Sequence, residues 1–314
     1  MSRGRILVIR GGAIGDFILT LPALAALRRQ FPQTHLTVLG YPQIAALAEL
    51  GGYAHETRSI EARALAGFFA RNGTLDPALQ EFFGGFNIII SYLYDPDEIF
   101  QTNVRRCTQA QFIAGPHRPN EAENIHATDV FLKPLERLAI FNGDAVPRLP
   151  LNSQPSTLNT LAIHPGSGSE KKNWPEEHWG ALLRRVVAET GWPVLLVGGE
   201  AEVERLQRLA SLVPVERLEV CLHRPLPEVA CRLAACRAFL GHDSGITHLA
   251  AAVGLRGVAL WGETNAAIWH PGGEGFELLR GAGGLEGIEP TRAFEAVARV
   301  MSESRNVQPR IELG

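Results

Sequence analysis

The chain has 314 residues, of which 46% are hydrophobic and 20% are charged, and its formal net charge is −3 at pH 7. This length is sufficient for two domains, each with its own hydrophobic core. The negative net charge argues against a general nucleic-acid binder, which would usually be basic. No run of about 20 apolar residues occurs, so no transmembrane span is predicted.

The N-terminus and the cysteines indicate a cytoplasmic protein. Arg3 and Arg5 precede an apolar run, but Asp16 and Pro22 interrupt it, which favours a strand, a turn and a helix over a targeting signal. The four cysteines show no CxxC pairing and are interpreted as reduced thiols. A peripheral contact with a membrane surface remains open.

The first half of the chain alternates apolar strand-like runs with helical segments. Strands are predicted at residues 5–9, 35–40, 56–60, 86–94 and 111–114, and helices at residues 17–30, 42–50 and 129–141. This alternation predicts a parallel sheet covered by helices on both faces.

The second half repeats the alternation after a stretch rich in Pro, Asn and Ser at residues 142–159, which is predicted to be a linker. Strands are predicted at residues 160–164, 194–198, 238–242 and 258–261, and helices at residues 175–189, 200–212, 226–236 and 291–303. We therefore expect an α/β protein with domains at residues 1–150 and 151–314 and a cleft between them.

The segment at residues 241–254 is the main candidate for a binding site. It is predicted to form a strand end, a tight polar turn with Asp243 and Ser244 at the N-cap position, and a helix that Gly254 ends. Gly245 leaves room for a ligand near the backbone, and a helix start suits a phosphate. The alternative is a capped turn that binds nothing, but two polar residues near the helix start, Asp243 and His248, favour a site.

Two other interpretations of this segment are disfavoured. The Asp-Ser-Gly tripeptide also occurs in serine proteases, but a catalytic triad is recognised by its geometry and not by three residues. His242 and His248 are six residues apart and do not share a helix face, and no Cys or Glu completes a metal site. We expect neither a protease nor a bound metal.

Three further loops follow predicted strands, where ligands bind in such sheets. Gly11 to Asp16 resembles a dinucleotide-binding loop, but Arg10 replaces the first glycine and no acidic residue follows the second strand, so NAD binding is disfavoured. Asp16 is then either a helix cap or a catalytic carboxylate, or both. The loop with Ser167, Gly168 and Lys172 is interpreted as a diphosphate site or as a solvated surface loop. In the loop from Gly198 to Glu202, a carboxylate either holds a ribose or complements a helix dipole.

A fourth loop contains Asp95-Pro96-Asp97. Paired aspartates can bind a divalent metal beside a sugar nucleotide, but Asp-Pro is also a common start of a turn. The turn is the preferred interpretation.

Taken together, these loops resemble glycosyltransferase family nine, the lipopolysaccharide heptosyltransferases. The similarity lies in Ile9-Arg10 with Gly12 to Asp16 and Leu19 to Leu24, in His164 to Ser167 with Lys172 to Pro175, and in Gly241 to Ala252. Gly262 to Asn265 resembles a fourth family motif, with Glu263 and Asn265 departing from it. Residues 53–140 carry no family motif, so the acceptor is not identified.

The resemblance implies a GT-B fold of two Rossmann-like domains, with the acceptor on the first and ADP-heptose on the second. It implies inverting transfer to a lipopolysaccharide core or similar glycan, with no cofactor and no metal. The residue roles that it implies are Asp16 as general base, Lys172 as the cation that neutralises the diphosphate, and Glu202 as a ribose contact. The implied donor-binding residues are Ser167, Gly168, Asp243, Ser244, Gly245 and His248. Gly11 and Gly12 replace serines found in several heptosyltransferases, which leaves another donor sugar open.

This scheme is chemically consistent. The attacking hydroxyl must lose a proton, which one carboxylate can take. The departing diphosphate gathers negative charge, which a lysine and a helix start can stabilise. The alternatives are an oxidoreductase, which NAD binding would reveal, and a nucleotide-sugar binding protein or epimerase, which would not need Asp16 as a base.

Overall fold

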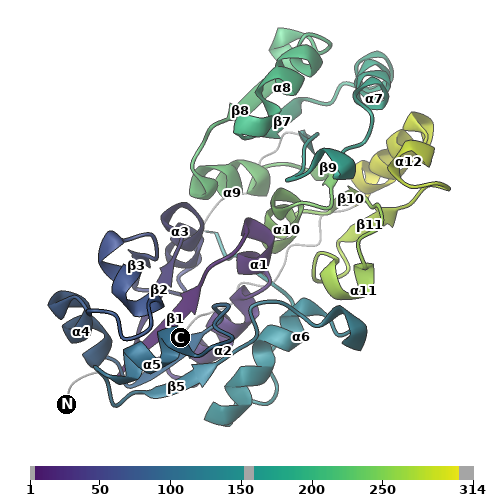
Figure 1. Cartoon of the computed structure of the whole chain (residues 1–314). Helices are drawn as coiled ribbons and strands as arrows, with labels where there is room; N and C mark the ends of the chain where they lie inside the picture. Colours follow the sequence, from purple (N-terminus) through teal and green to yellow (C-terminus); the bar gives the residue numbers. More distant parts are fainter. Residues whose placement is uncertain (1–3, 152–158, 304–314) are drawn as a thin grey trace. The chain divides into compact units, whose positions relative to one another are not determined.

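The structure is a computed structural model that describes residues 4–151 and 159–303. The chain divides between Pro147 and Arg148 into two compact units, an N-terminal and a C-terminal one, which are described separately (Figure 1). Residues 152–158 of the predicted linker lie outside the described residues. Across the described ranges, no helix is long and apolar enough to cross a membrane.

The N-terminal unit contains one parallel sheet with the strand order β3-β2-β1-β4-β5. The strands are β1 (Arg5–Arg10), β2 (His35–Gly40), β3 (Glu56–Ser59), β4 (Ile88–Ser91) and β5 (Gln111–Ala114). The chain winds outward from β1 to β3 and then returns to β4, so the direction of winding reverses between β1 and β4. Ligands of such sheets bind at the carboxyl ends of the strands beside this reversal, where the loop after β1 begins.

Short helices connect these strands. They are α1 (Ile14–Ile18), α2 (Leu21–Gln30), α3 (Pro42–Leu50), α4 (Pro77–Gly84), α5 (Ile99–Arg105) and α6 (Ala127–Leu132), with 3₁₀ segments η1 (Arg63–Phe69), η2 (Glu121–Glu123) and η3 (Lys133–Leu138). Because consecutive parallel strands are joined by right-handed crossovers, the reversal at β1 sends the connections to opposite faces of the sheet. The predicted covering on both faces follows from this order.

Two helix predictions in this unit are wrong in their extent, both because of proline. The helix predicted at residues 17–30 is split into α1 and α2, since Pro22 has no N–H to donate to the carbonyl of Ile18. The hydroxyl of Thr20 instead donates to the carbonyl oxygen of Asp16 at 2.8 Å. The helix predicted at residues 129–141 tightens into η3 at Pro134 and ends by Ala139, whose φ is 58°.

The C-terminal unit contains a second parallel sheet, with the order β11-β10-β9-β6-β7-β8. Its strands are β6 (Leu161–His164), β7 (Val194–Gly198), β8 (Leu218–Leu222), β9 (Ala238–His242), β10 (Gly257–Leu260) and β11 (Phe276–Leu279). The direction of winding reverses between β6 and β9. The predicted phosphate loops follow these two neighbouring strands.

The helices of this unit are α7 (Glu176–Glu189), α8 (Val203–Ala210), α9 (Leu226–Ala234), α10 (Gly245–Ala252), α11 (Ala266–Trp269) and α12 (Pro290–Ser302). The 3₁₀ segments are η4 (Glu170–Lys172), η5 (Glu200–Glu202), η6 (Val215–Arg217) and η7 (Leu285–Gly287). The helix predicted at residues 200–212 therefore begins as η5 and continues as the shorter α8.

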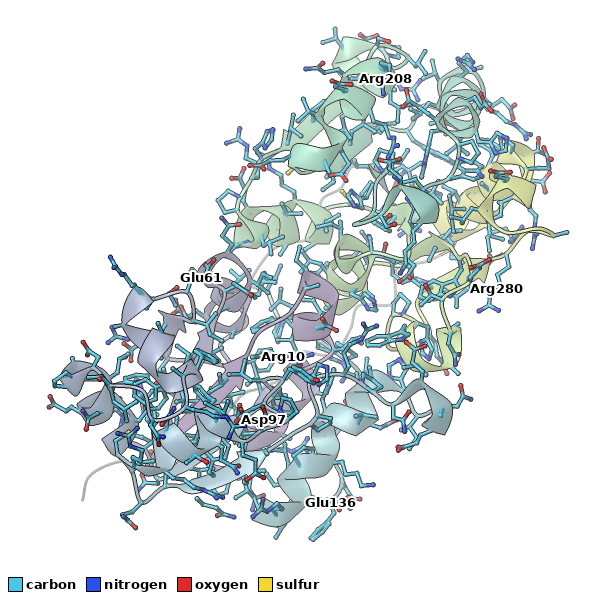
Figure 2. All side chains as sticks on the ribbon, in the orientation of Figure 1. Arg10, Glu61, Asp97, Glu136, Arg208 and Arg280 are labelled. Carbon is cyan, nitrogen blue, oxygen red and sulfur yellow. The ribbon has the colours of Figure 1, made fainter. Side chains whose placement is uncertain are left out.

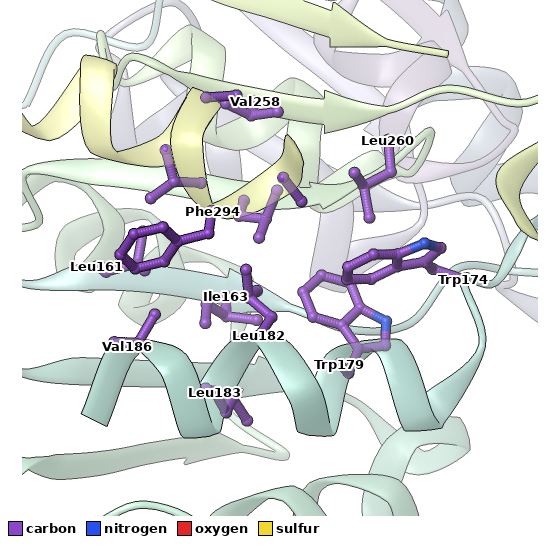
Figure 3. Close-up of a cluster of buried hydrophobic side chains, with 14 of the residues drawn as sticks. Leu161, Ile163, Trp174, Trp179, Leu182, Leu183, Val186, Val258, Leu260 and Phe294 are labelled. Atoms are coloured by element: carbon purple, nitrogen blue, oxygen red, sulfur yellow. The ribbon is translucent and has the colours of Figure 1, made fainter. Parts of the chain in front are cut away.

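The core of this unit lies between the sheet and the helices α7 and α12, which contact each other. Figure 3 shows Leu182 and Val186 of α7 directed toward Ile163 of β6. Trp174 and Trp179 close the same core at the end near the β6 loop, with their rings 5.1 Å apart. Full burial of each large apolar side chain contributes about 1.5–3 kcal/mol, so Trp174 anchors the loop that precedes it.

Candidate active site

The loop after β1 presents Asp16 at the start of α1. The sequence predicted a helix that begins after Asp16, at residue 17. The helix instead begins at Ile14, so Asp16 occupies its third position. Its Oδ2 accepts a hydrogen bond from the backbone N–H of Ala13 at 3.1 Å. Gly12 has φ of +99°, and a Cβ atom there would lie 2.9 Å from this same oxygen. The loop therefore requires glycine at residue 12 to hold the carboxylate in place.

Arg10, the last residue of β1, lies beneath this loop and was not predicted as a site residue. Figure 2 labels Arg10 within the N-terminal unit. Arg10 is 3% exposed, and its guanidinium packs over the ring of Phe131. Its Nη1 donates to the carbonyl oxygen of His117 at 2.9 Å and its Nη2 to that of Asp16 at 3.2 Å. Burial lowers the pKa of Arg10, while the nearby Asp16 opposes this. Arg10 thereby joins the first turn of α1 to the segment that follows β5.

The loop after β6 has a compact backbone built around Ser167. The Oγ of Ser167 lies 2.7 Å from the carbonyl oxygen of Ser169 and 2.9 Å from Oδ1 of Asn173. Ser167 is buried, whereas Gly168 is exposed and has open space around the position of a Cβ atom. Of these two predicted donor-binding residues, Ser167 holds the shape of the loop and Gly168 lies at its surface.

Lys172 in this loop contacts Asp243 in the loop after β9. Lys172 Nζ lies 2.7 Å from Asp243 Oδ2, and the side chains are 47% and 11% exposed. Lys172 follows β6 and Asp243 follows β9, the two neighbouring strands between which the direction of winding reverses. Two residues predicted from separate motifs, the cation and the carboxylate, are therefore brought together.

The start of α10 adjoins this ion pair. Ser244 is the N-cap, and its Oγ accepts from the backbone N–H of Thr247 at 3.3 Å, as the sequence predicted. Gly245 is the first helical residue, and His248 is buried one turn further along. Gly254 has φ of +84° just after the helix, which confirms it as the residue that ends α10.

Glu202 lies under the β6 loop. It is buried, and its Oε2 accepts from the backbone N–H of Gly199 at 2.8 Å. A Cβ atom at Gly166 would lie 2.4 Å from Glu202 Oε1, so the absence of a side chain there allows the close approach. The loops after β6, β7 and β9 thus meet at one edge of the sheet.

A second residue that sequence analysis did not predict, Arg205 on α8, holds the outer side of the β6 loop. Its Nη1 donates to the carbonyl oxygen of Pro165 and its Nη2 to Glu170, both at 3.2 Å. Hydrogen bonds from Asn173 and from Arg205 lower the pKa of Glu170. No motif distinguishes this arginine from others on helix surfaces.

Asp95 and Asp97 contact other groups of the N-terminal unit. Asp95 accepts from the backbone N–H groups of Phe100 and Gln101 at the start of α5, and Asp97 pairs with Arg71 at 3.4 Å. The interpretation of this segment as a turn is confirmed. In the part of the chain that the structure describes, no group of three or more His, Cys, Asp or Glu side chains could hold a metal ion.

Comparisons with known proteins agree with this arrangement of loops. A family model described as glycosyltransferase family 9 (heptosyltransferase) matches residues 144–282, which include the β6, β7 and β9 loops. Lipopolysaccharide heptosyltransferase 1 of Pseudomonas aeruginosa is 41% identical over 115 residues, which are 36% of this chain and 31% of that protein. The alignment thus spans less than a third of this relative's length.

Solved structures match nearly the whole chain. A glycosyl transferase family 9 protein from Veillonella parvula has a TM-score of 0.78 and 18% identity, covering 97% of this chain and 99% of that chain. E. coli heptosyltransferase WaaC with ADP has a TM-score of 0.75 and 18% identity, covering 94% and 99%. These matches confirm the predicted GT-B fold of two parallel α/β sheets. The match to glycosyltransferase family 9 in sequence thus covers residues 144–282 with the three C-terminal loops, and the solved structures extend the likeness in fold to nearly the whole chain.

Proposed function

We propose that the protein is an inverting glycosyltransferase that moves a heptose from ADP-heptose to a lipopolysaccharide core or similar glycan. The observation that carries this proposal is the pairing of Lys172 with Asp243 beside the start of α10. The Lys172 ammonium and the N–H groups at the start of α10 lie there at one edge of the sheet, which suits a diphosphate. A relative that contains ADP shares the fold, and a curated relative is a lipopolysaccharide heptosyltransferase.

In the proposed reaction, an acceptor hydroxyl attacks the anomeric carbon of the donor sugar. Asp16 takes the hydroxyl proton while the bond from that carbon to the diphosphate breaks, and ADP leaves with the bonding electrons. Lys172 and the start of α10 stabilise the charge that collects on the diphosphate. Attack from the face opposite the leaving group inverts the configuration.

The acceptor is proposed to bind at the carboxyl edge of the N-terminal sheet. Two exposed aromatic residues, Tyr41 and Tyr94, follow β2 and β4 at this edge, where Asp16 follows β1. Tyrosines of this kind offer an apolar ring face and a polar hydroxyl, a combination suited to a sugar. For a glycolipid acceptor, the enzyme would work at the cytoplasmic surface of a membrane.

Transfer is proposed to need no metal, because Lys172 and a helix start carry the charge that a divalent ion would otherwise neutralise. Turnover should then be the same with and without EDTA. Loss of turnover in EDTA, with recovery on addition of a divalent ion, would instead assign metal binding to carboxylates such as Asp95 and Asp97.

The binding test uses the tryptophans, because all five lie in the C-terminal unit. ADP should raise the midpoint of the unfolding transition detected by tryptophan fluorescence, and Lys172→Ala should weaken ADP binding by about tenfold or more in calorimetry. Lys133→Ala, a change in the N-terminal unit, is the matched control. Unchanged ADP affinity in Lys172→Ala would show that this lysine is not part of the site. Tighter binding of a UDP- or GDP-sugar than of ADP-heptose would show that the donor carries another nucleotide.

A further inference from the structure

His242 is the last residue of β9 and lies immediately before Asp243. It is fully buried, and both of its ring nitrogens contact the backbone of the β6 loop. Nε2 lies 2.7 Å from the backbone nitrogen of Trp174, and Nδ1 lies 3.1 Å from the carbonyl oxygen of Gly166. Because a backbone N–H can only donate, Nε2 accepts, and the ring proton on Nδ1 is donated to Gly166.

The surroundings of the ring keep it in this single form. Desolvation lowers the pKa of His242 to about 3, with smaller contributions from His164 and Arg205 in the same direction, while Gly166 and Asp243 oppose it. The ring also packs edge-on against the ring of Trp179, with the two ring centroids 5.3 Å apart. A proton on Nε2 would face the N–H of Trp174, donor against donor, so the neutral ring fits both contacts.

The two contacts enclose residues 166–174. This segment carries Ser167 and Lys172, and its far end is anchored separately because Trp174 Nε1 donates to the carbonyl oxygen of Ile288 at 2.9 Å. One imidazole therefore ties both ends of the segment to the end of β9. Asp243, the residue after His242, forms the ion pair with Lys172.

We propose that His242 is a positioning residue for the diphosphate of the donor, acting through the backbone at Gly166 and Trp174 without touching the donor itself. By closing the segment 166–174, it holds the Lys172 ammonium over the start of α10. This inference rests on the proposed donor site, and it assigns to a buried side chain the placement of the cation in that site.

The test compares variants that remove one or both contacts. His242→Asn keeps a donor near the place of Nδ1, His242→Gln keeps an acceptor near the place of Nε2, and His242→Leu keeps neither. The matched control is His178→Gln, because His178 also packs on Trp174, at 5.2 Å, yet its Nδ1 has no hydrogen-bond partner among the described residues. Affinities for ADP and for adenosine, which lacks the diphosphate, are measured by calorimetry.

ADP affinity should fall by about tenfold or more in His242→Leu and by less in the Asn and Gln variants. Adenosine affinity should stay within about twofold of the parent in all of them, as should both affinities in His178→Gln. A general loss of structure would instead weaken both ligands together. Parent-like ADP affinity in His242→Leu, or equal loss for ADP and adenosine in every variant, overturns the proposal.

A second readout separates this proposal from the proposed function. Exchange of the Trp174 amide hydrogen, followed by NMR without ligand, should be at least tenfold faster in His242→Asn than in the parent, because Asn lacks the acceptor near Nε2. It should be restored toward the parent rate in His242→Gln. If the parent itself fails to bind ADP, the donor assignment fails, while the exchange rates still decide whether His242 closes the segment. Equal exchange in all variants would contradict the closure.

Discussion

At the scale of single residues, the candidate site depends on polar groups that are paired within the protein. Lys172 contacts Asp243, and Asp16 accepts from the backbone of its own helix start. An incoming diphosphate would share the Lys172 ammonium with Asp243, so the lysine is held in place before the donor arrives. Positioning of this kind reduces the ordering cost that a flexible lysine would otherwise add to binding.

His242 predicts how stability depends on pH. Its pKa is lowered to about 3 in the folded chain, so below pH 6.5 the unfolded chain binds a proton that the folded chain does not. Its contribution to stability is complete above pH 6.5 and decreases as the pH falls from 6.5 toward 3. The loss for one such histidine is about 1.4 kcal/mol per pH unit, or about 2 kcal/mol between pH 7 and pH 5.

The measurement is urea unfolding detected by tryptophan fluorescence at pH 7 and pH 5, in the parent and in His242→Asn. The pKa of His164 is also lowered by burial, so both proteins should lose stability in acid, but the variant by about 2 kcal/mol less. The same loss in both proteins would show that His242 titrates normally or not at all.

Residues that belong to local motifs were predictable from the sequence, whereas residues that act over long separations in the chain were not. Ser244 and Gly254 were predicted from helix caps, which are local features. Arg10 contacts His117 at a separation of 107 residues, and His242 contacts Gly166 at a separation of 76. No spacing in the sequence encodes such contacts, since they arise only when the sheet brings distant loops together.

At the scale of elements, the strands of the N-terminal sheet and the central strands of the C-terminal sheet were predictable, whereas the two edge strands of the C-terminal sheet were not. The central strands β1, β6 and β9 are continuous apolar runs, as expected for parallel strands covered on both faces. The missed strands β8 and β11 lie at the edges of their sheet and contain Glu219 and Glu277, which interrupt the apolar pattern. The short helices α4 and α5 were missed because helices of seven or eight residues give little periodic signal.

The turn between β1 and α1 gives a matched pair of glycine variants. Gly12→Ala should destabilise the N-terminal unit by about 1–3 kcal/mol, because φ of +99° is costly for alanine and the new Cβ would meet the Asp16 carboxylate. Gly11→Ala should change stability by less than about 0.5 kcal/mol, since the neighbours there are at ordinary contact distance.

Both variants should be examined by thermal unfolding followed by circular dichroism and by turnover. Gly12→Ala should lower kcat without changing ADP affinity, because it displaces Asp16 and leaves the C-terminal unit intact. Equal stability and turnover in the two variants would mean that the loop does not need glycine at residue 12.

At the scale of the whole molecule, the proposed base and the proposed donor-binding residues lie in different units. Asp16 belongs to the N-terminal unit, and Lys172, Glu202 and Asp243 belong to the C-terminal unit. Asp16, Lys172 and Asp243 follow strands beside the reversal of winding in their sheets, which is where open parallel sheets bind ligands. The proposed reaction therefore separates donor binding from proton removal, and one variant can test the second without disturbing the first.

That variant is Asp16→Asn. Asparagine can still accept from the N–H of Ala13, and the hydrogen bonds of Arg10 and Thr20 go to the backbone oxygen of residue 16. Only the 3.9 Å ion pair between Arg10 and the Asp16 carboxylate is lost, so the fold should be kept. Asparagine cannot take a proton, so kcat for transfer from ADP-heptose should fall by roughly 10²- to 10⁴-fold. ADP affinity and melting temperature should match those of the parent. A near-normal kcat in a folded Asp16→Asn protein would contradict the account and leave the acceptor hydroxyl without its assigned base.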